Sequence, residues 1–165
     1  ETEHKVIHRS VTPENLLQRK NDKVVKLCDL MLAKALEGTQ AKQVTAPGQL
    51  IGNVSYMSPE RIADTSNLDW RSDQYGLGAT LFALLSGRPP FESKMLPDLV
   101  KQIRDAPVRF PSEIQQDTPP SFIAIVQKML EKQPDQRFAY PSELLGALND
   151  LGSESGVDAD ALYNN

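Results

Sequence analysis

The chain contains very little cysteine or histidine. Its 165 residues include one cysteine, Cys28, and two histidines, His4 and His8. A single thiol excludes an intramolecular disulfide and a cysteine-rich metal site, and two histidines are too few for a zinc site unless carboxylates join them. Low cysteine use agrees with a reducing compartment, so we expect a cytoplasmic chain or the cytoplasmic part of a longer one.

Long apolar runs and an excess of basic charge are also absent. The longest apolar stretch, within residues 75–85, is interrupted by Gly76, Gly78 and Thr80. No segment therefore approaches the roughly 20 apolar residues of a membrane span. The net charge of -4 gives no sign of a basic patch able to hold nucleic acid, and we expect no nucleic-acid partner. The sequence begins at Glu1 rather than Met, so we expect an upstream part to be missing.

Apolar periodicity predicts one small hairpin followed by helices. Leu16-Leu17 and the β-branched run of residues 24–28 flank a polar turn, which is typical of two short strands. Residues 38–52 lack periodicity and predict a long loop. Pro59 suits the first turn of a short helix within residues 58–62.

The strongest pattern is a helix over residues 75–85 that is apolar on nearly every face, which indicates a buried central helix. Ser72-Asp73 is the predicted N-cap, and Gly87 the predicted stop. Amphipathic helices are predicted over residues 95–104 and 121–132, and a last helix over 141–151. Residues 152–165 contain acidic but no basic side chains, and we expect a disordered tail.

Six short motifs follow one another in chain order. Residues 8–17 resemble H-R-D-L-x-x-x-N, Asp29-Leu30-Met31 stands at the place of D-F-G, and residues 52–60 are similar to a segment that ends in A-P-E. Residues 72–78 are similar to the start of a buried helix, and residues 87–91 to its exit. Residues 129–137 are similar to a late segment that contains an arginine. Together they resemble the C-terminal lobe of eukaryotic-like serine/threonine protein kinases.

The resemblance covers residues 4–150 and implies a mainly α fold, α+β by family: a protein kinase-like C-lobe with a helical bundle around a buried central helix and a small β-hairpin region. The predicted domain is residues 1–151, and the N-terminal lobe with its Gly-rich loop and lysine is absent from it.

The resemblance also implies that phosphotransfer residues have been replaced. Ser10 stands at the catalytic aspartate, Thr12 at a lysine that meets the transferred phosphate, and Asn53 at a threonine that supports both. A serine hydroxyl is uncharged at neutral pH, and loss of a positioned general base costs about 10²–10⁴-fold in rate. Met31 replaces the D-F-G glycine. We therefore predict an inactive domain.

Other family positions are retained. Asn15 and Asp29 stand where the family binds Mg²⁺, so they are the candidate cofactor and metal residues. Hard oxygen ligands need phosphates to complete the magnesium shell. We therefore expect no cofactor in this chain alone, and ATP with Mg²⁺ only if an N-terminal lobe is supplied.

A further group is expected to be structural. The resemblance pairs Glu60 with Arg137, makes Asp73 an acceptor for backbone N–H groups of the catalytic loop, and packs His8 in the core. Arg9 is either a phosphate receiver or a locally paired arginine.

Three functions remain open from the sequence. The first is an inactive signalling module that binds a protein partner through the apolar surface left by the missing lobe, without nucleic acid or membrane. The second is a fragment of a serine/threonine kinase that transfers the ATP γ-phosphate to protein. The third is a decaying gene piece without a selected function.

Overall fold

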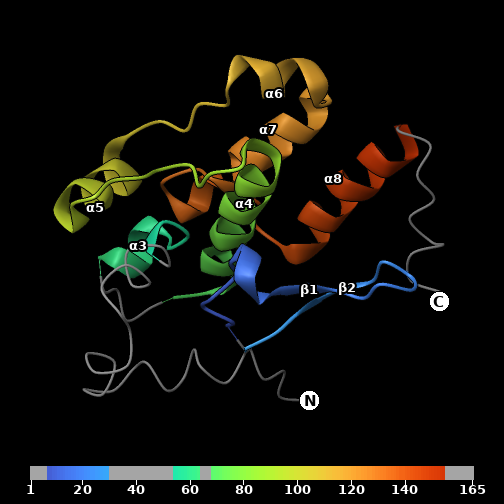
Figure 1. The fold of residues 1–165 in the computed structure, drawn as a ribbon, viewed down its shortest axis with the longest axis horizontal. Helices are drawn as coiled ribbons and strands as arrows, with labels where there is room; N and C mark the ends of the chain where they lie inside the picture. The colour runs from blue at the N-terminus through green and yellow to red at the C-terminus, as the bar shows by residue number, and fades with distance from the viewer. Residues whose placement is uncertain (1–6, 30–53, 64–67, 155–165) are drawn as a thin grey trace.

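In the part of the chain that the structure describes, the protein is mostly helical, with one small two-stranded sheet (Figure 1). The computed structural model describes residues 7–29, 54–63 and 68–154. Its elements in chain order are η1 (Pro13–Asn15), β1 (Leu16–Gln18), β2 (Val25–Leu27), α3 (Pro59–Ile62), α4 (Trp70–Ser86), α5 (Leu96–Asp105), α6 (Ser112–Asp117), α7 (Pro120–Met129), η3 (Pro134–Gln136) and α8 (Pro141–Glu154).

Helix α4 is the central helix of the fold. Its residues Tyr75, Ala79 and Phe82 are at most 2% exposed, so the predicted buried helix is confirmed. The helix ends at Gly87, which adopts the left-handed φ of 73° that glycine tolerates without strain. Its start differs from the prediction, because the N-cap is Asp69, whose side chain accepts the N–H of Arg71.

The predicted N-cap residues lie inside the helix because their polar groups have distant partners. Ser72 Oγ donates to Glu60, and the Asp73 carboxylate accepts backbone N–H groups of His8 and Arg9. Sequence pattern alone does not distinguish a polar residue that caps a helix from one that binds another segment. The prediction of an N-cap at Ser72-Asp73 was therefore wrong.

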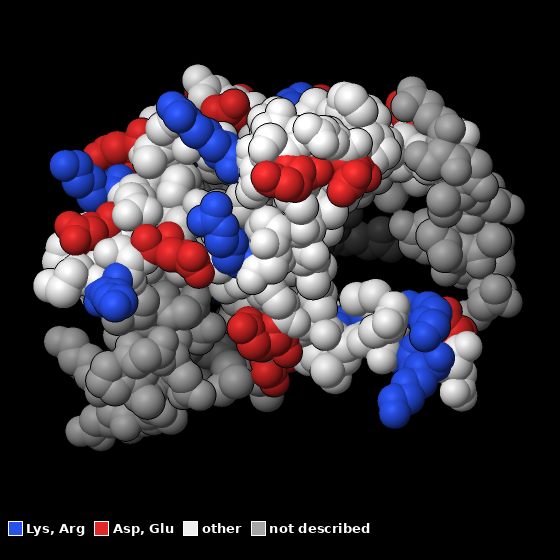
Figure 2. Space-filling model, turned by 45° about the horizontal axis from the view of Figure 1, so that its top comes forward, with Lys and Arg blue, Asp and Glu red and all other residues white. Residues whose placement is uncertain are grey.

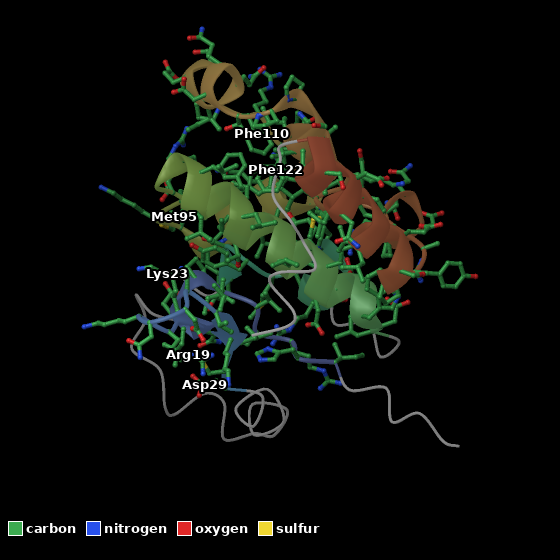
Figure 3. All side chains as sticks on the ribbon, turned by 90° about the vertical axis from the view of Figure 1, so that its right-hand side faces the viewer. Arg19, Lys23, Asp29, Met95, Phe110 and Phe122 are labelled. Atoms are coloured by element: carbon green, nitrogen blue, oxygen red, sulfur yellow. The ribbon has the colours of Figure 1, made fainter. Side chains whose placement is uncertain are left out.

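The core is formed where α5 and α7 pack against α4. The rings of Phe82 and Phe110 have centroids 4.7 Å apart, and Figure 3 shows Phe110 and Phe122 beside α4. Helices α4 and α7 approach closely at Gly78, where an added Cβ would lie 2.9 Å from the Cβ of Met129. A second cluster joins α7 to α8 through Met129 and Leu144.

The amphipathic helices lie close to their predicted bounds. Helix α7 ends at Met129, earlier than predicted, because the carbonyls of Glu131 and Lys132 accept hydrogen bonds from Arg137 instead of continuing the helix. Helix α8 continues to Glu154, into the segment predicted as tail, and residues 155–165 lie outside the described residues. The predicted loop 38–52 also lies outside them.

Helix α6 was not predicted. It has six residues with one apolar side chain, Ile114, which gives no period for a sequence pattern to detect.

The predicted hairpin is present but poorly covered. Strands β1 and β2 are antiparallel, with Leu16 opposite Leu27, and Leu17 and Val25 are 61% and 55% exposed. The hairpin carries the basic side chains Arg19, Lys20, Lys23 and Lys26, and Asp22 is paired with Arg19 among them. Both signs of charge are mixed over the helical part (Figure 2). Among the described residues, no helix combines the length and apolar character that a membrane crossing requires.

Candidate functional site

The segment from His8 to Asn15 is attached to the central helix by Asp73. The backbone N–H of His8 lies 2.6 Å from Asp73 Oδ2, and that of Arg9 lies 2.6 Å from Oδ1. Arg9 has a left-handed φ of 66°, which costs a non-glycine residue about 1–2 kcal/mol. Two charge-assisted hydrogen bonds to one carboxylate offset that strain and fix the direction of the loop. The acceptor contact expected for Asp73 is therefore present.

His8 joins this loop to the end of β2. Its Nε2 lies 2.9 Å from the carbonyl oxygen of Cys28, and its Nδ1 lies 3.3 Å from the backbone N–H of Ser10. Because a carbonyl only accepts and a backbone N–H only donates, these contacts suit the tautomer in which Nε2 donates and Nδ1 accepts. Both ring nitrogens are thus engaged within the fold, and the ring is buried, as the sequence predicted.

Ser10 and Asn15 are in direct contact. The Asn15 amide Nδ2 donates to the Ser10 carbonyl oxygen at 2.8 Å and to Ser10 Oγ at 3.1 Å. Sequence reasoning missed this contact, since Asn and Ser five positions apart carry no pairing signal. The Ser10 hydroxyl is uncharged at neutral pH, so the described loop offers no carboxylate at this position.

Thr12 is enclosed by the fold. It is only 4% exposed, and its carbonyl accepts the N–H of Asn15 as η1 begins. The neighbouring Val11 carbonyl accepts Thr80 Oγ1 from α4 at 3.1 Å. The side chain at this position is therefore short, neutral and buried. Asn53, the third predicted member, lies outside the described residues, as do Leu30 and Met31.

Asp29 follows β2 and is exposed, with a left-handed φ of 64°. The chain before it is tied to η1, because the N–H of Cys28 donates to the Asn15 carbonyl at 2.9 Å and Cys28 Sγ lies 3.2 Å from the same oxygen. The fold therefore brings the segments of Asn15 and Asp29 together. Figure 3 shows Asp29 with Arg19 at the end of the molecule opposite Phe110 and Phe122.

The metal-ligating capacity of this place is small. Within the described ranges, no group of three or more His, Cys, Asp or Glu side chains is arranged to hold a metal ion. Asn15 Nδ2 donates hydrogen bonds to Ser10, so the amide oxygen is the atom of this side chain that could bind a metal ion. Two side-chain oxygens fit Mg²⁺ only as part of a shell that phosphates and water complete.

Glu60 of α3 and Arg137 after η3 form a bidentate ion pair. Nη1 lies 2.8 Å from Oε1 and Nη2 2.9 Å from Oε2, and the Arg137 side chain is fully buried. The remaining N–H groups donate to three carbonyls, those of Glu131, Arg71 and Lys132. All five guanidinium donors are therefore used.

The Glu60 carboxyl responds to two opposing influences. Burial raises its pKa, but the hydrogen bonds and charge of Arg137, together with the hydrogen bond from Ser72 Oγ at 2.7 Å, outweigh burial. The net result is a lowered pKa, so Glu60 stays ionised inside the fold.

Comparison with known proteins agrees with this architecture. Residues 2–146 match the model of the protein kinase domain. The chain is 38% identical to the serine/threonine-protein kinase PknB of Mycolicibacterium smegmatis, over 95% of this chain and 25% of that protein. It is 35% identical to PknL of Mycobacterium tuberculosis, over 81% of this chain and 32% of that protein.

The chain belongs to the protein kinase family, and its fold and relatives place it in a serine/threonine kinase domain, where it resembles the C-terminal lobe. A third relative, PknH of Mycobacterium bovis, is 31% identical over 93% of the chain. The chain spans about a quarter to a third of the length of these relatives.

Proposed function

We propose that this chain is a catalytically inactive kinase-domain module that acts in signalling by binding a protein partner in the cytoplasm. The observation that carries the proposal is the contact between Ser10 and Asn15, because a neutral hydroxyl occupies the catalytic position and accepts a hydrogen bond there. The buried, neutral Thr12 supports the same conclusion. Neither group can accept a proton from a substrate hydroxyl at neutral pH or meet a phosphate as a cation.

The retained framework supports binding rather than catalysis. Asp73 still fixes the catalytic loop, and Arg137 still joins Glu60, although the reacting groups differ. A fold that keeps these contacts can serve as a recognition surface, since fold and chemistry are separable.

The partner would cover the exposed apolar side chains of the hairpin. Val25 and Leu27 lie on the same face as Leu16 and are 55% and 43% exposed, whereas Leu17 lies on the opposite face and is 61% exposed. A two-stranded hairpin with uncovered faces is marginally stable by itself, so covering it would stabilise both the hairpin and the attached loop.

No cofactor is expected to bind to this chain alone. If an N-terminal lobe supplied a nucleotide, Asn15 and Asp29 would hold Mg²⁺, which would neutralise charge on the phosphates. Their retention favours a second candidate function, that of a fragment of a kinase that transfers the ATP γ-phosphate to protein serine or threonine.

A thermal-shift titration with ATP and Mg²⁺ tests these functions, because a ligand that binds the native state raises the melting temperature. Cooperative melting without a shift is expected. A saturable shift that requires Mg²⁺ and disappears in Asp29→Ala would overturn the proposal in favour of the second candidate. Aggregation without any cooperative transition would favour a decaying gene piece.

A further inference from the structure

Lys132 lies in a surface hollow between the ends of α5 and α7. The hollow has a volume of about 380 Å³, and its other lining residues are Asp105, Pro107, Val108, Gln127, Leu130 and Glu131. Helix α5 lies on the side of α4 away from the hairpin (Figure 1). None of the residues that line the hollow belongs to the segment from His8 to Asn15 or to the hairpin.

Two contacts hold the Lys132 amine inside the protein. Nζ donates to the carbonyl of Ile103 at 2.7 Å and lies 4.2 Å from the centre of the Phe91 ring. Ile103 is fully buried and Phe91 is 6% exposed, so both partners are fixed parts of the core. The amine of this half-buried lysine is thus partly removed from water and held in a defined position.

The charged groups around Lys132 do not balance this loss of hydration. Burial lowers the pKa of its amine, the charge of Arg137 lowers it further, and Asp105 and Glu131 only partly oppose them, which leaves a pKa of about 8. Arg137 is also in direct contact with Lys132, because its Nη2 donates a hydrogen bond to the Lys132 carbonyl. A substantial fraction of the amine is therefore neutral, and nucleophilic, near neutral pH.

We propose that Lys132 is a modification site, at which small activated acyl donors such as acyl phosphates or thioesters preferentially acylate this chain. Lys132 lines a hollow large enough for a small acyl group, and the contacts with Ile103 and Phe91 hold its amine in a defined position. The inference is independent of the proposed function, since no group of the catalytic loop takes part.

The reaction balances without any further reactant. The lone pair of neutral Nζ attacks the acyl carbon, a C–N bond forms, and the C–O bond to phosphate or the C–S bond to the thiol breaks. Phosphate or thiolate leaves with the electron pair, and the surplus proton on nitrogen passes to water. The product is a neutral amide that keeps one N–H able to donate to the Ile103 carbonyl and no longer repels Arg137.

Lys128 provides a matched comparison within the same chain. Its Nζ lies 4.2 Å from the centre of the Phe138 ring, the same distance as that between Lys132 and Phe91. Lys128 is exposed on α7 and does not line the hollow. A difference between the two lysines therefore reports on burial and the hollow rather than on the contact with an aromatic ring.

The test uses limiting acetyl phosphate on the full chain, at a temperature below its cooperative thermal transition, with acetylation of each lysine measured by peptide mass spectrometry. A pKa lowered from 10.5 to about 8 raises the neutral fraction at about pH 7.5 by about 200-fold. Lower basicity also reduces the nucleophilicity of the neutral amine and offsets part of this gain, so Lys132 should still be acetylated severalfold faster than the exposed Lys128.

Two further measurements complete the test. In concentrated urea, the ratio of the two rates should fall to about one, because unfolding returns both amines to water. The Lys132→Arg variant should lose the fast signal and keep the labelling of Lys128. Equal rates for Lys132 and Lys128 in the folded chain, or a fast signal that persists in Lys132→Arg, would overturn the proposal.

Discussion

Arg137 and Glu60 form a two-point ion pair across 77 positions of sequence, with N–O distances of 2.8 and 2.9 Å. The pair ties the short helix α3 to the loop between α7 and α8. Through the Arg71 carbonyl, 2.7 Å from Nη1, it also holds the first turn of α4. One buried side chain thus connects α3, the first turn of α4 and the loop between α7 and α8.

Replacing this arginine should destabilise the whole fold. Arg137→Ala leaves Glu60 as a largely buried charge and three carbonyls without their donor, and breaking one partner of such a pair costs about 3–5 kcal/mol. At about 2–4 °C per kcal/mol, the melting temperature should fall by about 10 °C. Thermal denaturation followed by circular dichroism measures the fall.

A surface ion pair supplies the control for that experiment. Arg104 and Asp105 are paired at 2.8 Å, but their side chains are 65% and 49% exposed. Arg104→Ala should therefore change stability by less than about 1 kcal/mol. Equal melting temperatures for Arg137→Ala and Arg104→Ala would contradict a structural role for the buried pair.

The sequence revealed the large features of this fold because they depend on patterns that repeat. Residues 75–85 are apolar on nearly every side, which identified the central helix, and motif order identified the partners Glu60 and Arg137. The details that escaped prediction depend on single tertiary contacts. Asp69 rather than Asp73 caps α4, because Asp73 has the loop N–H groups as partners.

The candidate site was predictable only at the level of residue positions. Motif comparison located Ser10 and Asn15 but gave no sign that the amide of one bonds the hydroxyl of the other. It located Thr12 without indicating that this side chain is buried. The hollow around Lys132 had no sequence signal at all, because it is built from the ends of two helices and the residues that follow them.

Asp73 should determine how rigidly the loop from His8 to Asn15 is held. Asp73→Asn keeps the shape of the side chain but replaces one accepting oxygen with an amide group, which cannot accept the N–H of His8 or Arg9. We expect a loss of about 1.5–3 kcal/mol of stability, the range for hydrogen bonds to a charged group. Hydrogen exchange measured for the His8 and Arg9 amides should accelerate.

Asp98→Asn is the control for this change, because Asp98 is exposed on α5 and its side chain has no role in the loop. Its effect on exchange at His8 and Arg9 should be negligible. Unchanged protection of both amides in Asp73→Asn would show that other contacts determine the loop conformation.

Replacing two helical glycines with alanine should change the stability of the fold in opposite directions. In Gly78→Ala the new Cβ would lie 2.9 Å from the Cβ of Met129, so α4 and α7 must separate, at a cost of about 1–3 kcal/mol. In Gly146→Ala the new Cβ meets nothing within 4 Å, and alanine should stabilise α8 by about 0.5–1 kcal/mol. Urea denaturation of both variants measures the difference, and destabilisation by Gly146→Ala would contradict the packing described for α8.

The stability of the fold should depend on Lys132 in alkaline solution. Its folded pKa of about 8 lies below its ordinary value of 10.5, so the unfolded chain binds more protons between these two pH values. Stability contributed by this group therefore rises as pH increases from about 8 to 10.5, and is lowest below pH 8, where the amine is charged in both states. The amine is partly exposed, so solvent screening should limit the change to about 1 kcal/mol.

Lys132→Met isolates this contribution from other groups that titrate in the same range. Burial raises the pKa of Tyr56 and of Tyr75, and their effect on stability has the opposite sign, because the folded chain then holds its protons to higher pH. Both proteins share these tyrosines, so the difference between their unfolding free energies removes that effect. The unfolding free energy of the parent chain should increase relative to that of Lys132→Met as pH rises from about 8 to 10.5. A difference that stays constant across this range would mean that Lys132 titrates alike in the folded and unfolded chains, and the inference that its amine is unusually reactive would lose its physical basis.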